Sequence, residues 1–143
     1  MCVSVSVHQY TNERPGAAMF HHIDPRSPIP LYVQIASRLR LAIATGEIAP
    51  AMPLPSVRQL AAEIRVNPAT VVQSYRDLER DGFIESRQGA GTFVRNLAEP
   101  RRSSERQREA RRLVRELVAE ASGLGITTAE IEQAWKNETE GRR

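Results

Sequence analysis

Two short helices joined by three or four residues are the feature that most constrains the fold of this chain. Ser56, with Gln59 three residues later, forms a capping-box pattern, which predicts that a helix begins directly after Ser56. Asn67 followed by Pro68 predicts the start of a second helix, because proline lacks the N–H that would have no partner in a first turn. The second helix is predicted to end at Gly82, since glycine readily adopts the left-handed conformation that follows a helix.

The second helix has one apolar face and one polar face. A period of 3.6 residues places Val71, Tyr75 and Leu78 inward. The outward face is small and polar at its start, which suits a helix in a DNA major groove, where Thr, Gln and Arg side chains reach base edges or phosphates. This face comprises Ala69, Gln73, Arg76 and Arg80, with Thr70 at its flank. The pattern is that of a helix-turn-helix, although a helical hairpin whose polar face meets only water would share it.

A glycine-rich hairpin is predicted directly after the second helix. Strand-like residues 83–87 and 92–94 flank the turn formed by residues 88–91. A hairpin in this position is a wing. Its tip places Arg87 and Gln88 beside glycines, so side chains and backbone N–H groups can approach a phosphate or a minor groove. The sequence therefore predicts a winged helix-turn-helix over residues 21–97.

Three motifs together resemble the GntR family of bacterial transcription regulators. They are LPSVRQLA, VNPATVVQSYRDLERDGFI and SRQGAGTFV, in this order and spacing. The resemblance covers residues 28–95. It implies DNA contact by Arg58 and Thr70, and it implies that the wing lies near a minor groove or phosphate. Arginines that some relatives carry at the positions of Pro68 and Val72 are absent here, so the base preference of those relatives is not carried over.

The polar face and the resemblance together give one set of candidate DNA-binding residues. In the wing, Gln88 and Gly89 are the stronger candidates and Arg87 and Thr92 the weaker ones. The full set is Arg58, Asn67, Ala69, Thr70, Gln73, Arg76, Arg87, Gln88, Gly89 and Thr92.

Residues 31–45 are predicted to form a further helix that packs behind the other two. Apolar residues recur at helical spacing through this stretch, and Gly46 ends it. The connector that follows contains Ile48, which we expect to supply a minimal strand against the wing. The family usually has a glycine near Ala51 or Met52, so we expect a slightly different turn there without loss of function.

Residues 98–143 are predicted to form a helical dimerisation segment. Residues 100–112 contain six Arg and two Glu, a balance that favours a solvated helix face or linker over direct DNA contact. Thr127 and Glu130 form a capping box that opens a final helix. Two amphipathic helices of this size cannot build an independent core, so they must bury their apolar residues on the winged helix or on a second copy of themselves. The candidate dimerisation residues are Leu113, Val114, Leu117, Val118, Ala121, Ile131 and Trp135.

The branch of the family is indicated by residues 67–71, Asn-Pro-Ala-Thr-Val. This sequence resembles the small YtrA-like branch and also the branch fused to aminotransferase-like domains. We expect the YtrA-like branch, because 143 residues leave no room for an aminotransferase. YtrA-like proteins, as the resemblance implies, dimerise through a short C-terminal helical pair.

Residues 1–20 are predicted to be a disordered N-terminal extension. The alternation of Val and Ser near the start has no strand to pair with, and the composition changes just before Met19. We therefore expect translation to begin at Met19 rather than Met1. The adjacent His21 and His22 are poorly placed to ligate one metal, so no metal site is expected.

Composition excludes several classes of protein. The formal net charge of +3 weakly favours an anionic partner, and a single cysteine excludes an internal disulfide and suits a reducing cytoplasm. No apolar stretch is long enough to span a membrane, and no secretory signal is recognisable. The motifs of phosphate-binding loops, HExxH metalloproteases and GxSxG hydrolases are also absent. We therefore expect a soluble cytoplasmic protein that is not an enzyme and needs no cofactor.

The sequence as a whole predicts a mainly α fold with a small β wing: a winged helix-turn-helix followed by a short two-helix dimerisation segment. The predicted function is sequence-specific binding of double-stranded DNA by a homodimeric transcription regulator, a repressor by family habit, acting on a palindromic operator. The effector ligand, if there is one, is unknown. The alternative is a winged-helix protein-interaction module without sequence-specific DNA binding.

Overall fold

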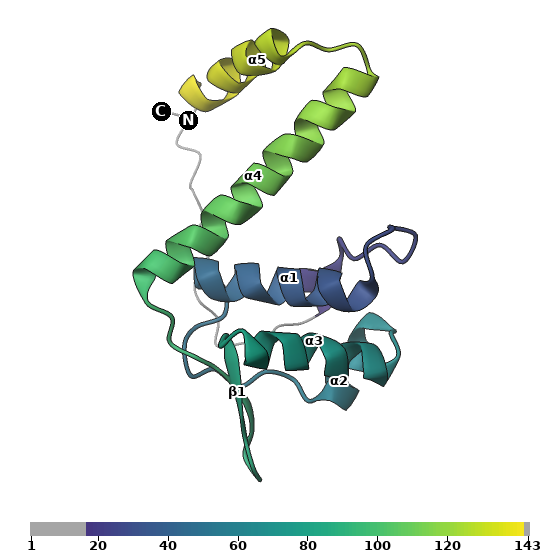
Figure 1. Ribbon diagram of the computed structural model, residues 1–143, viewed down its shortest axis with the longest axis vertical. Coiled ribbons are helices and arrows are strands. Elements are labelled where there is room, and N and C mark those ends of the chain that lie inside the picture. Colours follow the sequence, from purple (N-terminus) through teal and green to yellow (C-terminus); the bar gives the residue numbers. More distant parts are fainter. Residues whose placement is uncertain (1–16, 142–143) are drawn as a thin grey trace, which may run out of the picture. The chain divides into compact units, whose positions relative to one another are not determined.

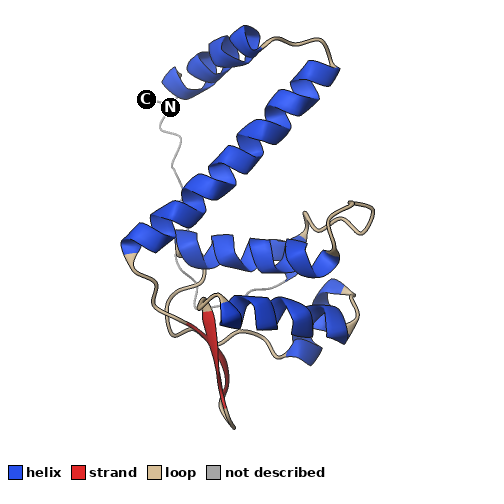
Figure 2. Ribbon diagram, viewed as in Figure 1, coloured by secondary structure: helices blue, strands red, loops and turns tan. Residues whose placement is uncertain are grey.

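The computed structural model describes residues 17–141, and it is mainly helical with one small antiparallel sheet (Figures 1 and 2). It divides into two compact units, Met1–Glu105 and Arg106–Arg143. The elements in chain order are η1 (Ala17–Phe20), α1 (Leu31–Thr45), α2 (Val57–Ile64), α3 (Pro68–Arg80), β1 (Ile84–Arg87), β2 (Gly91–Val94), α4 (Glu99–Gly123) and α5 (Thr128–Glu140). This is the predicted winged helix-turn-helix followed by two C-terminal helices.

Helix α1 has the predicted bounds and forms one wall of the core. Gly46 follows it with φ 82°, and the Gly46 N–H donates to the carbonyl of Ile43. Its buried stripe includes Ile35, Leu39 and Ala42, each at most 1% exposed. These side chains pack in the core that α1 shares with α3, which runs alongside α1 (Figure 1).

The turn between α2 and α3 is built from the predicted caps. The Ser56 hydroxyl accepts the backbone N–H of Gln59 at 3.1 Å, and the Gln59 side chain accepts the N–H of Ser56 at 3.0 Å. Arg65 closes α2 in the left-handed conformation, with φ 56°. Asn67 then caps α3 by accepting the N–H of Ala69 at 2.9 Å. The geometry confirms both predicted helix starts.

The end of α3 is a Schellman motif, as predicted. Gly82 has φ 77°, and its N–H donates to the carbonyl of Glu79 at 3.0 Å. The N–H of Phe83 donates to the carbonyl of Leu78 at 2.9 Å, and both of these side chains are buried. The motif turns the chain sharply from α3 into the wing.

The wing, residues 84–94, consists of β1 and β2 paired antiparallel, with Ile84 opposite Val94. It projects away from the helices (Figure 2). A third extended segment joins it, because the carbonyl of Thr92 accepts the N–H of Leu54 and the carbonyl of Met52 accepts the N–H of Val94. The expectation that Ile48 supplies this segment is wrong. The Ile48 N–H donates to the carbonyl of Ala42 directly after α1, and its side chain is buried in the core.

The N-terminal end of the described chain is part of the core. Residues 17–20, which we expected to belong to a disordered extension, form the 3₁₀ helix η1. Met19 and Phe20 are buried, and the guanidinium of Arg38 donates to the Met19 carbonyl at 2.9 Å. The rest of the expected extension, residues 1–16, lies outside the described residues. Translation from Met19 stays a prediction.

The C-terminal unit contains most of α4 and all of α5. Gly125, with φ 78°, lies in the turn between the two helices. The predicted capping box is present, since the Thr127 hydroxyl accepts the Glu130 N–H and the Glu130 carboxylate accepts the Thr127 N–H at 2.8 Å. The backbone N–H of Thr127, and after it the Thr127 hydroxyl, donates to the Glu130 carboxylate, and these two hydrogen bonds lower the pKa of Glu130.

Candidate nucleic-acid interface

Helix α3 presents the predicted polar face to solvent. Ala69, Gln73 and Arg76 are exposed, and Thr70 is half-buried at the flank. The opposite side is fixed in the core by apolar contacts and by two hydrogen bonds. The Tyr75 hydroxyl donates to the carbonyl of Pro55 at 2.7 Å, and the Ser74 hydroxyl donates to the carbonyl of Tyr32 at 2.9 Å. These contacts on the inward side fix the rotation of α3 and so the direction in which its polar face points.

Burial keeps the phenol of Tyr75 neutral. The loss of water around the hydroxyl is the main effect that raises its pKa, and the negative charge of Glu63 adds to the shift. The hydrogen bond from Tyr75 to the segment before α2 is therefore present throughout the ordinary pH range. It joins α3 to Pro55, which lies just before α2.

Two exposed arginines are available to an anionic partner. Among residues 17–141, Arg58 near the start of α2 and Arg76 on α3 have no ion-pair or hydrogen-bond partner for their side chains. An unpaired guanidinium can form charge-assisted hydrogen bonds with phosphate or with guanine at little cost in lost protein contacts. Both residues were predicted from the sequence, and their contact with DNA stays a prediction.

Other candidate side chains on α3 already have protein partners. Gln73 donates its amide N–H to the carboxylate of Asp77 at 3.1 Å, and Arg80 lies 3.3 Å from the same carboxylate. The side-chain oxygen of Asn67 is used by the helix cap. Asn67 therefore has a positioning role that the sequence also indicated, whereas the Gln73–Asp77–Arg80 network was not anticipated.

At the wing, the exposed tip is formed mainly by Gln88, Gly89 and Ala90. Gly89 has φ 77°, and nothing lies within 4 Å of the place where a β-carbon would be, so its backbone is open to a ligand. Arg87 is less available than predicted. Its guanidinium lies 2.6 Å from the carboxylate of Glu85 and 4.7 Å from the centre of the Phe93 ring. Thr92, on β2, is half-buried.

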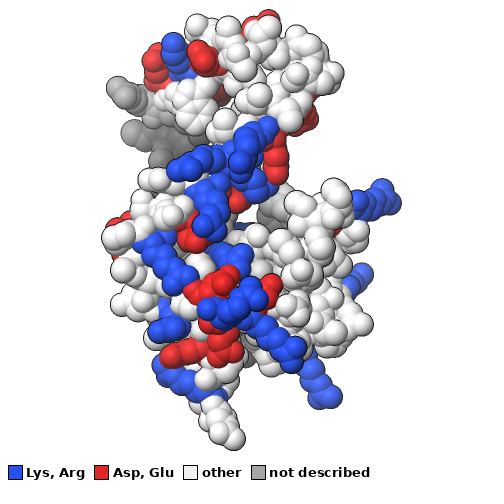
Figure 3. All heavy atoms as spheres, in the orientation of Figure 1, with Lys and Arg blue, Asp and Glu red and all other residues white. Residues whose placement is uncertain are grey.

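The surface charge is mixed. Figure 3 shows Lys and Arg side chains interspersed with Asp and Glu on the face in view rather than one continuous basic surface. Close to α3, Asp77 and Asp81 account for part of this mixture, because they pair with Arg80 and with Arg40. The face in view therefore does not present one large positive field.

Within residues 17–141 no cluster of His, Cys, Asp or Glu side chains is arranged to hold a metal ion. None of the helices in that range has the length and apolar character needed to cross a lipid bilayer.

Comparison with known proteins identifies the family. The family model for bacterial regulatory proteins of the gntR family matches residues 31–94. The HTH-type transcriptional regulator YhcF of Bacillus subtilis is 34% identical over 116 residues, which cover 81% of this chain and 95% of the relative. The chain belongs to the GntR family.

Two more relatives support the assignment over most of the chain. The HTH-type transcriptional repressor YtrA of Bacillus subtilis is 34% identical over 111 residues, covering 78% of this chain and 85% of that protein. A solved GntR family transcriptional regulator from Listeria monocytogenes superposes with a TM-score of 0.62 at 30% identity, covering 80% of this chain and 97% of the other. This GntR protein is therefore a DNA-binding transcription regulator of the YtrA-like type and not an enzyme.

The C-terminal helices carry an exposed apolar surface. Of the predicted dimerisation residues, Leu113, Val114, Leu117, Val118 and Trp135 are 36–66% exposed. Ile131 is half-buried, and Ala121 is buried. The turn adds two residues that the sequence analysis did not single out, since Leu124 and Ile126 are 71% and 44% exposed. Helical periodicity does not extend into a turn, which is why these two were missed.

Proposed function

We propose that this GntR protein is a homodimeric repressor that binds a palindromic operator. Each subunit would place α3 in a major groove and the tip of the wing against the flanking backbone. The proposed DNA-binding unit is residues 21–97, and the proposed dimerisation segment is residues 98–143. That YtrA of Bacillus subtilis is named a repressor supports the direction of control.

The main support for a homodimer is the exposed apolar surface on α4 and α5. Monomeric proteins rarely leave several large apolar side chains exposed close together, and such patches mark interaction sites. Leu113, Leu117 and Val118 recur at helical spacing on α4, so they form a stripe that a second copy can cover. A twofold axis then pairs two recognition helices, which is the symmetry of a palindromic site.

The DNA-binding face is supported by the free guanidinium groups of Arg58 and Arg76 beside a helix with small exposed residues at its start. Arginine is well suited to contact both phosphates and guanine, and the alanine and threonine at the start of α3 allow close approach to base edges. The open tip at Gly89 supports contact between the wing and the DNA backbone.

The first experiment is a mobility-shift titration with DNA from the intergenic region upstream of the protein's own gene, against a scrambled duplex of equal length. Arg58→Ala should weaken specific binding about tenfold or more, since one good contact contributes about 1–3 kcal/mol. Arg26→Ala is the matched control, because Arg26 is an exposed arginine outside the helix-turn-helix. Equal loss in both variants would show only a charge effect and would contradict the proposed face.

The second experiment tests the dimer by sedimentation at several protein concentrations. Leu117→Glu places a charge in the apolar stripe and should give monomers with weakened operator binding. Arg115→Glu puts the same side chain at an exposed neighbouring position on α4 and should leave the dimer intact. A monomeric wild-type protein that still binds a palindromic site tightly would refute the proposed assembly.

A further inference from the structure

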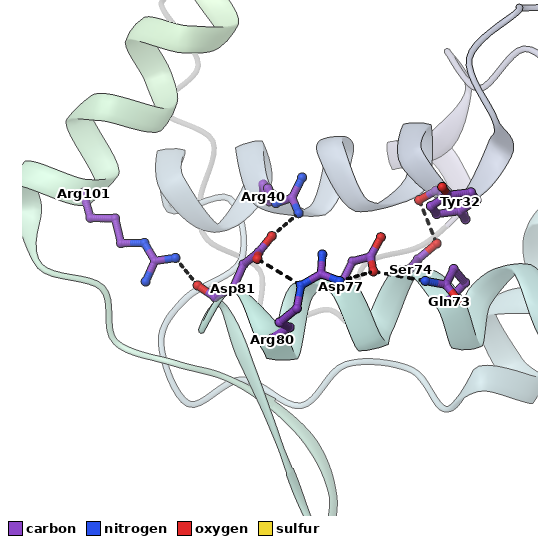
Figure 4. A network of polar contacts seen from close by, with 8 residues as sticks. All are labelled: Tyr32, Arg40, Gln73, Ser74, Asp77, Arg80, Asp81 and Arg101. Atoms are coloured by element: carbon purple, nitrogen blue, oxygen red, sulfur yellow. Dashed lines mark hydrogen bonds and ion pairs between the residues drawn. The ribbon is translucent and has the colours of Figure 1, made fainter.

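We propose that Arg101 and Arg102 are positioning residues that set the distance between the two operator half-sites. The inference rests on the proposed homodimer, and it concerns how the first turn of α4 is attached to the DNA-binding unit. Both arginines lie within the first compact unit, as do all the groups they contact. Figure 4 shows the part of this arrangement that surrounds the end of α3.

Arg101 holds the C-terminal end of the recognition helix. Its guanidinium donates a hydrogen bond to the backbone carbonyl of Asp81, the residue that ends α3 (Figure 4). Carbonyls at this end of a helix have no partner within the helix and carry partial negative charge, so a cation satisfies them well. The same guanidinium lies 4.6 Å from the centre of the buried Phe83 ring. Arg101 therefore contacts both the last turn of α3 and the first residue after Gly82.

Arg102 contacts the C-terminal end of α1. Its Nε donates to the carbonyl of Ala44 at 3.3 Å, in the last turn of α1. Consecutive residues on a helix point about 100° apart, because there are 3.6 residues per turn. Two adjacent arginines directed at two separate helix ends therefore fix both the position and the rotation of the first turn of α4.

The surrounding residues make the attachment tight. The carboxylate of Asp81 pairs with Arg40 of α1, so α1 and α3 are also tied to one another at this point (Figure 4). A β-carbon at Gly82 would lie only 3.2 Å from the Arg101 guanidinium. The φ of 77° favours glycine at this position, and the Arg101 guanidinium would have to move by a few tenths of an ångström to make room for a β-carbon.

Because α4 is long, a small change in its tilt at this attachment produces a large displacement of its far end. Its 25 residues span about 37 Å at a rise of about 1.5 Å per residue. A tilt of about 10° at the start would displace the other end by about 6 Å, close to two base-pair steps of about 3.4 Å. Loosening the Arg101 contact should therefore allow the two recognition helices to accept several half-site spacings.

The test is selection of bound sequences from a random duplex library by the full-length wild-type protein and by Arg101→Ala. The wild type should enrich paired half-sites at one spacing. The variant should enrich the same half-site sequence at neighbouring spacings as well, with affinity for an isolated half-site within about twofold of the wild type. Arg101→Lys can still donate to the Asp81 carbonyl, so it should give an intermediate distribution. Arg115→Ala, which removes an exposed arginine from the same helix, should match the wild type.

The possible results separate this inference from the function on which it rests. A single, unchanged spacing for Arg101→Ala would overturn the positioning role. A large loss of half-site affinity in that variant would overturn it too, because Arg101 would then serve the integrity of the DNA-binding unit. If the wild type enriches no paired half-sites, the proposed homodimer on a palindrome fails, and the spacing inference fails with it.

Discussion

Replacing Ala51 with glycine should stabilise the protein. Ala51 lies between α1 and α2 with φ 66°, a left-handed conformation in which the alanine β-carbon is crowded. Its side chain is exposed, so no packing is lost when it is removed. Its backbone N–H donates to the carbonyl of Val94 at 2.8 Å, and glycine keeps that hydrogen bond. The family resemblance implies a glycine near this position, and the positive φ gives the physical reason.

The expected gain follows from two opposing terms. Relieving a left-handed alanine contributes about 1–2 kcal/mol, and the greater freedom of glycine in the unfolded chain costs about 0.5–1 kcal/mol. The free energy of unfolding should therefore rise by about 0.5–1 kcal/mol. For a domain of this size that corresponds to a Tm increase of about 2–8 °C.

The assay is thermal and urea unfolding of wild type and Ala51→Gly at one fixed protein concentration, because association would make Tm depend on concentration. Ala49→Gly is the matched control, since Ala49 is exposed in the same connector but does not have a positive φ. The control should lose about 0.5–1 kcal/mol through backbone entropy alone. If both variants are destabilised equally, the left-handed conformation at Ala51 carries no cost and the reasoning is refuted.

Three other substitutions have directions that the structure determines. Tyr75→Phe should lower the free energy of unfolding by about 1–3 kcal/mol at neutral pH in urea denaturation, because a buried hydrogen bond is lost. Burial raises the pKa of Tyr75 in the folded state, so its contribution is complete below the unfolded pKa of about 10 and is lost above it. The difference between wild type and variant should therefore shrink at alkaline pH, and a constant difference would contradict this. Asn67→Ala should cost about 1 kcal/mol and reduce the helical circular dichroism signal, since the N–H of Ala69 loses its cap. Gly82→Ala should cost about 1–2 kcal/mol in thermal unfolding, because Gly82 has a φ of 77°, and an unchanged Tm would contradict a penalty for that left-handed conformation.

Helix boundaries were predictable because caps act over only a few residues. Ser56 with Gln59, Asn67 with Pro68, and Gly82 each fix a helix end by hydrogen bonds to backbone groups nearby in the sequence. The hydrophobic period of α3 placed its inner and outer faces correctly for the same reason. Features of this kind are local, so the sequence contains all the information needed to find them.

Contacts between distant elements were not predictable in this way. Ile48 was expected to supply a minimal strand against the wing, but its N–H donates to the carbonyl of Ala42 in the preceding helix. The extended partner of the wing is instead the segment around Pro53, which lacks an N–H yet forms a bridge to Phe93. Strand propensity does not distinguish these two segments. Which of them pairs with the wing depends on where the end of α1 lies in the folded chain.

The contacts of the arginines in residues 100–112 were also not predictable from the sequence. Composition alone treats its six arginines as equivalent, and a solvated helix face is the natural interpretation. In the structure, Arg102 is only 32% exposed and donates to α1, a helix that has no basic residue in its own last turn. A helix end that lacks a local cation can be satisfied by one far along the chain. Arg102 does this for α1, and Arg101 donates to the Asp81 carbonyl that follows α3. Both arginines come first in the run, where the chain is still close to α1 and α3, and this position lets a charged segment attach α4 to the DNA-binding unit.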